Sequence, residues 1–132
     1  MKLKITSKPL AVLAKELGLP VLQNHGYVTK FYEPKTNTIR SLGMTGRNPI
    51  SKLIYAPPLE LLQKWVREKH KLILICYSNA SGFLWDLSSY HGTQLQWSEF
   101  DGPNEGGVWK TWEEALEAGL FYTLNRIKNE KL

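Results

Sequence analysis

The apolar run Leu72–Tyr77 is the only stretch of six consecutive residues in the sequence that carries no charge, glycine, proline or side-chain amide and is apolar throughout. A short apolar run rich in β-branched and aromatic residues predicts a strand that is covered on both faces. Ser78–Gly82 stops the run, since serine, asparagine and glycine are typical of a turn. We therefore expect a central strand at this position, with helices supplying the cover.

Three other segments repeat apolar residues at intervals of three and four, the pattern of an amphipathic helix. The first follows Ser7 as N-cap and ends at Gly18. The second opens at Pro57–Pro58 and runs to about His70. The third opens at Thr111, which is expected to cap it. The expected inner faces are Leu10, Leu13, Ala14 and Leu17; Leu61, Leu62, Trp65 and Val66; and Trp112, Ala115, Leu116, Gly119, Leu120, Thr123, Leu124 and Ile127.

Further strands are predicted where apolar and polar residues alternate. The segments 83–88 and 93–98 would complete an antiparallel meander with 72–77, and 101–107 is expected to be a loop. Nearer the N-terminus, 27–32 and 38–42 have the composition of two strands joined by a turn. Residues 21–57 are otherwise the least interpretable part of the chain.

The order of these elements predicts an α+β fold. Residues 59–129 should form an antiparallel sheet of three or more strands packed by two helices, in the order αβββα. An N-terminal helix and hairpin extend it. With 132 residues, the chain has the length of a single domain, in which 1–57 is less regular and 58–132 forms the core.

Hydrophobic content of 42% and charged content of 22% are typical of a globular protein and exclude a disordered one. We expect no membrane span and no signal peptide, because no apolar run approaches the ~18–20 residues of a bilayer helix. A single cysteine permits no intrachain disulfide. These features together predict a cytoplasmic protein.

The net charge of +5 is unevenly distributed. Residues 1–71 hold 13 Lys and Arg against 4 Asp and Glu, whereas 72–132 hold 4 against 8. A basic half interleaved with aromatic residues is able to bind phosphates and stack bases. A solvated edge hairpin would have the same composition, because edge charges oppose aggregation. The nucleic-acid contacts that this pattern predicts are Lys30, Arg40, Arg47, Lys52, Lys64 and Arg67.

Several stretches resemble known families. The αβββα order of 59–129 looks like that of double-stranded-RNA-binding domains, although the start of the last helix, 110–114, is mostly acidic where that family has lysines. Residues 13–18 resemble the first helix of helix-turn-helix domains, but 21–27 does not continue as a recognition helix. The strings 61–70 and 111–120 resemble small uncharacterised proteins of bacteria and their prophages, a group that implies no activity.

Motifs of catalysis and of cofactor or metal binding are absent from the sequence: it has no P-loop, GxSxG elbow, CxxC or paired histidines. We therefore predict no cofactor and a non-enzymatic interaction module, which binds a protein partner or itself. Its expected contact surface is Trp97, Trp109, Asp101 and Asn104. Nucleic-acid binding is the alternative hypothesis, and an enzyme using Asp86, Glu99 and Asp101 is a third.

Overall fold

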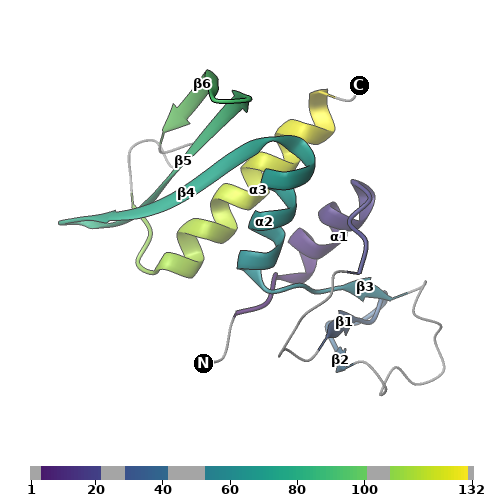
Figure 1. Ribbon diagram of the computed structural model, residues 1–132. Coiled ribbons are helices and arrows are strands. Elements are labelled where there is room, and N and C mark those ends of the chain that lie inside the picture. The colour runs from purple at the N-terminus through teal and green to yellow at the C-terminus, as the bar shows by residue number, and fades with distance from the viewer. Residues whose placement is uncertain (1–3, 22–28, 42–52, 101–107, 131–132) are drawn as a thin grey trace. The chain divides into compact units, whose positions relative to one another are not determined.

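The computed structural model describes residues 4–21, 29–41, 53–100 and 108–130, and it has an α+β fold, as the sequence predicts (Figure 1). Its contacts divide the chain into two compact units, residues 1–58 and 59–132. The first contains α1 (Lys8–Glu16), β1 (Lys30–Tyr32), β2 (Ile39–Ser41) and β3 (Ile54–Tyr55). The second contains α2 (Leu59–His70), β4 (Leu72–Asn79), β5 (Gly82–His91), β6 (Gln94–Phe100) and α3 (Trp112–Glu130), which is the expected αβββα order.

The N-terminal unit is built on an antiparallel sheet in the order β2-β1-β3. The predicted hairpin of β1 and β2 is confirmed, but β1 is the central strand and not a solvated edge. Its residues Phe31 and Tyr32 point to opposite faces and are only 1% and 7% exposed, respectively. The strand that buries them, β3, has two residues and was not predicted. A strand of two residues is too short to show the alternation of apolar and polar positions by which strands are predicted.

Helix α1 supplies part of the cover for this small sheet. Its residue Ala11 packs with Tyr32, Ile54 and Ala56 in one apolar cluster. The helix ends at Glu16, and the expected terminator Gly18 follows two residues later with a φ of +90°, a conformation that glycine adopts without steric cost. The backbone N–H of Gly18 donates to the carbonyl of Lys15 at 3.0 Å. The residues expected to start and end this helix therefore located it correctly.

The C-terminal unit contains the predicted meander, with strands in the order β4-β5-β6 and antiparallel throughout. Asn79 closes the turn between β4 and β5, because its side-chain oxygen accepts hydrogen bonds from the backbone N–H groups of Ser81 and Gly82 at 2.8 and 3.1 Å. The register pairs Leu74 with Leu87 and Cys76 with Trp85. These four side chains therefore lie on one face of the sheet, and all are buried.

Helix α3 packs on that inner face through its glycine. A β-carbon added at Gly119 would lie 2.8 Å from Cδ1 of Leu74 and 3.0 Å from Cγ of Trp85. The close approach of helix and sheet thus requires this glycine. The Thr111 side chain accepts a hydrogen bond from the backbone N–H of Glu114 at 3.1 Å, so Thr111 caps the helix as predicted.

The predicted buried stripe of α3 is correct at every position except Trp112. That residue is 37% exposed, so its predicted place in the inner face of the helix is wrong. Trp112 occupies the first position of the helix, where no preceding turn covers it. In α2, likewise, Leu59 is buried while Leu61 is only half-buried, and the helix begins at Leu59, after the two prolines.

The expectation that Leu72–Tyr77 is covered on both faces is also wrong. Its residues alternate: Leu74 and Cys76 are 3% and 5% exposed, whereas Ile75 and Tyr77 are 53% and 36% exposed. The reason is that β4 is an edge strand and both helices pack on the inner side of the sheet. Helix α3 contacts β4 and β5, while α2 contacts β4 and α3 (Figure 1).

Candidate functional site

The outer face of the β4-β5-β6 sheet is the first candidate surface. Ile75 and Tyr77 stand on it from β4, and the register places Asp86 and Leu84 beside them on β5. Among the described residues of this face only Leu84 is buried, at 5% exposure. Exposed large apolar side chains that adjoin one another are typical of an interaction surface. Neither an acid–base pair nor a nucleophile accompanies them in the part of the chain described.

The edge of β4 adjoins this face and carries backbone hydrogen-bonding groups. Gln63 of α2 donates from Nε2 to the carbonyl of Leu74 at 2.6 Å, which shows that Leu74 directs its backbone groups away from β5. Because backbone direction alternates along an antiparallel strand, Cys76 and Ser78 direct theirs the same way. Within the described residues, no hydrogen bond reaches the backbone groups of these two residues at this edge. An edge of this kind accepts a further strand.

Cys76 lies under this edge, on the inner face, with 5% of its surface exposed. Burial first, and the negative charge of Asp86 second, raise the pKa of its thiol from 9.0 to about 12. The thiol therefore remains protonated in the folded protein at neutral pH. Because the thiolate is the reactive form, Cys76 serves as a small apolar core residue and not as a nucleophile.

This protonation predicts slow alkylation of Cys76 and a loss of stability in alkali. Iodoacetamide at about pH 8 should modify the folded chain at least ~100-fold more slowly than the denatured chain, as followed by mass spectrometry. The folded state keeps the proton that the unfolded state releases above about pH 9, so the unfolding free energy should fall as pH rises from 9.0 towards about 12. Equal alkylation rates in the two states would show that the thiol is accessible.

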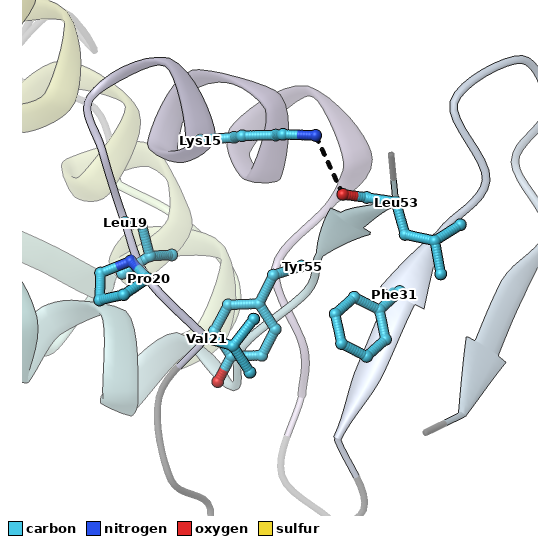
Figure 2. Close-up of a pocket in the computed structure, with 7 residues that line it drawn as sticks. All are labelled: Lys15, Leu19, Pro20, Val21, Phe31, Leu53 and Tyr55. Atoms are coloured by element: carbon cyan, nitrogen blue, oxygen red, sulfur yellow. Dashed lines mark hydrogen bonds between the residues drawn. The ribbon is translucent and has the colours of Figure 1, made fainter. Parts of the chain in front are cut away.

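A cavity of about 250 Å³ lies in the N-terminal unit (Figure 2). Its walls are apolar except for Lys15, whose ammonium donates to the carbonyl of Leu53 at 3.0 Å. This volume is below the roughly 300–1,000 Å³ usual for ligand pockets. The remaining lining residues are Leu19, Pro20, Val21, Phe31 and Tyr55. Apart from the Tyr55 phenol, none of these side chains carries an acidic, basic or thiol group. The cavity thus favours no reaction.

The two tryptophans of the predicted partner surface lie at opposite ends of β5. Trp97 pairs with Ser89, and Trp109 bridges Phe83. These partners are six positions apart along β5, which corresponds to about 20 Å. Both rings are half-buried, and the guanidinium of Arg126 lies 3.9 Å from the centre of the Trp97 ring. A cation–π contact already occupies one face of that ring.

The other two residues of that predicted surface, Asp101 and Asn104, lie outside the described residues, as do Arg47 and Lys52 of the basic set. The carboxylates proposed for an enzyme are likewise incomplete, because only the Asp86 side chain is described. Within the described ranges there is no group of three or more His, Cys, Asp or Glu able to hold a metal ion. No described helix is long and apolar enough to cross a membrane.

The four basic residues that are described do not form one set. In the N-terminal unit, Arg40 pairs with Phe31 across the hairpin and Lys30 with Ser41, so the two basic side chains point to opposite faces of the sheet. Arg40 also donates to the carboxylate of Glu33 at 2.6 Å.

In the C-terminal unit, Lys64 and Arg67 are exposed on α2, three residues apart. The ammonium of Lys64 lies 3.9 Å from the carboxylate of Glu68. Among the described residues, Lys30 and Arg40 thus share no phosphate-binding surface, whereas Lys64 and Arg67 are neighbours on the exposed side of α2.

Comparison with protein-family models, curated proteins and solved structures finds no match to this chain. The apolar run that located the core does not by itself reveal that β4 is an edge strand, since such a run is equally typical of a strand covered on both faces. One signal was present: the strand ends in Ser78 and Asn79, which favour solvent.

Proposed function

We propose that this protein is a small non-enzymatic interaction module that works through the outer face and edge of β4. The observation that carries the proposal is a strand with two exposed apolar side chains, Ile75 and Tyr77, at 53% and 36% exposure, and with an edge at Cys76 and Ser78 to which no described residue hydrogen-bonds. Such a strand offers main-chain hydrogen bonds for affinity and side chains for specificity. An intracellular role in a bacterium or its prophage agrees with the resemblance of 61–70 and 111–120.

Replacement of Ile75 by lysine tests this proposal. The substitution adds a charge to the exposed face without disturbing the buried one, so the chain should fold. An isotopically labelled bait distinguishes captured proteins from the chain itself in a bacterial lysate. We expect wild type and a Leu95→Lys control, altered at a residue of β6 that is 51% exposed, to retain the same protein. Ile75→Lys should lose it.

Retention of one set of proteins by all three baits would contradict a role for β4. The control is matched, because it too replaces an exposed aliphatic residue with lysine, but on the opposite edge strand. Nucleic-acid binding through Lys30, Arg40, Lys64 and Arg67 stays an alternative proposal, and no described contact favours it. A low-salt titration with duplex and single-stranded nucleic acid addresses it directly, because phosphate contacts are strongest there.

A further inference from the structure

We propose that the edge of β4 pairs with the β4 edge of a second copy of this chain, so that the two three-stranded sheets become one antiparallel sheet. This inference rests on the interaction function proposed above and names the partner. An antiparallel strand edge is complementary to itself, because a two-fold axis places each N–H of one copy opposite a C=O of the other.

The composition of β4 favours a second copy over an unrelated partner. The strand contains no charged residue and no proline, and its pairing with β5 shows no bulge. Charge, proline and bulges are the usual means by which proteins prevent edge pairing. The opposite edge strand, β6, has both a register shift at Ser89/Tyr90 and the charged residue Glu99. The facing β4 strands of two copies therefore meet without charge repulsion.

Gln63 determines the register of this pairing. Its Nε2 already donates a hydrogen bond to the carbonyl oxygen of Leu74 at 2.6 Å. A second strand is therefore confined to the part of β4 that follows Leu74. In that part, Cys76 and Ser78 direct their backbone groups outward. The symmetric register that uses both pairs Cys76 of one copy with Ser78 of the other. It places Tyr77 directly opposite Tyr77 of the second copy.

This register also covers the exposed apolar side chains. In an antiparallel sheet, the side chains of a non-hydrogen-bonded pair are closer together than those of a hydrogen-bonded pair. The two Tyr77 residues form a non-hydrogen-bonded pair in this register. Ile75 of each copy flanks the tyrosine pair on the same outer face. The 53% exposure of Ile75 and the 36% exposure of Tyr77 therefore mark the residues that the second copy would bury.

Analytical ultracentrifugation of the purified full chain over a hundredfold concentration range tests the proposal. We expect a monomer–dimer equilibrium. Tyr77→Lys should raise the dimer dissociation constant by about tenfold or more, because it sets two like charges directly opposite each other. Leu95→Lys, on a residue that is 51% exposed in β6, should leave the constant unchanged. Circular dichroism confirms that each variant is folded.

Disulfide trapping tests the register independently. In a Cys76→Ala background, Tyr77→Cys should form a disulfide-linked dimer on mild oxidation, because facing residues of such a pair approach within the range of a disulfide. Ile75→Cys should form it much more slowly, since this residue faces Asn79 of the second copy. Rapid trapping at both positions would overturn the register.

A wild-type chain that is monomeric at every concentration would overturn the second-copy proposal. So would an equal effect of Tyr77→Lys and Leu95→Lys on the dissociation constant. If a monomeric chain still captures a lysate protein in a manner that depends on Ile75, the second copy is rejected and the interaction function stands. If neither association occurs, both proposals fail.

Discussion

Replacing Trp85 with alanine is expected to lower the free energy of unfolding by about 3–5 kcal/mol. The Trp85 side chain is fully buried at 0% exposure in β5, and its ring centre lies 5.1 Å from that of Tyr122 on α3. The missing indole would leave a cavity between sheet and helix that rigid secondary structure fills poorly. Urea denaturation measures the loss, and a constant slope with denaturant shows that stability alone has changed.

Trp112→Ala is the matched control. This ring is 37% exposed at the start of α3, so we expect a loss of about 1 kcal/mol or less. Since total stability of a small domain is about 5–15 kcal/mol, Trp85→Ala has the potential to unfold the chain, and Trp85→Phe provides a milder test at about 1–2 kcal/mol. No described residue hydrogen-bonds Nε1 of Trp85, so phenylalanine loses volume only. Equal losses for the two alanine variants would contradict the packing.

Replacing Gly119 with valine is expected to cost about 3 kcal/mol. An added β-carbon would meet Leu74 at 2.8 Å and Trp85 at 3.0 Å, both closer than van der Waals contact permits. The Leu74 contact is the end of a flexible side chain, whereas the Trp85 contact is the ring itself, so α3 must move away from the sheet. Thermal and urea unfolding of the full chain measure the effect.

The Gly119→Ala variant tests whether an added methyl group raises or lowers the free energy of unfolding. Helix propensity alone predicts that alanine stabilises the helix by about 0.5–1 kcal/mol, whereas the contact with Trp85 predicts a net loss of about 1 kcal/mol. Asn125→Val, at an exposed position of the same helix, should change stability by no more than about 0.5 kcal/mol. A stabilised Gly119→Ala variant would show that the helix and sheet have room at this position.

Local signals in the chain were sufficient for most of the elements. Gly18 ended α1, Thr111 opened α3, and the interval of three and four residues identified every buried position of α3 and, wrongly, the exposed Trp112. These signals are reliable because caps and periodicity act within a few residues of one another. The prediction was wrong for Trp112 because this residue has the spacing of a buried position but lies in the first turn of the helix, where no preceding turn covers it.

The candidate site was less predictable. Trp97 and Trp109 are close in sequence, yet they lie at opposite ends of β5, and Arg126 from a distant part of the chain lies over the Trp97 ring. The position of a side chain relative to residues on another strand depends on register. Register follows from long-range pairing that no local pattern contains.

By itself, the sequence determined the α+β class, the order helix, three strands, helix in residues 59–129, and the inner face of α3. Those features depend on which residues avoid water at a fixed period along the chain. Only the tertiary structure decided that β4 is an edge, that Ile75 and Tyr77 are exposed, and that Gln63 occupies the Leu74 carbonyl. A continuous apolar run is compatible with one covered face or two, and the difference depends on where the helices pack.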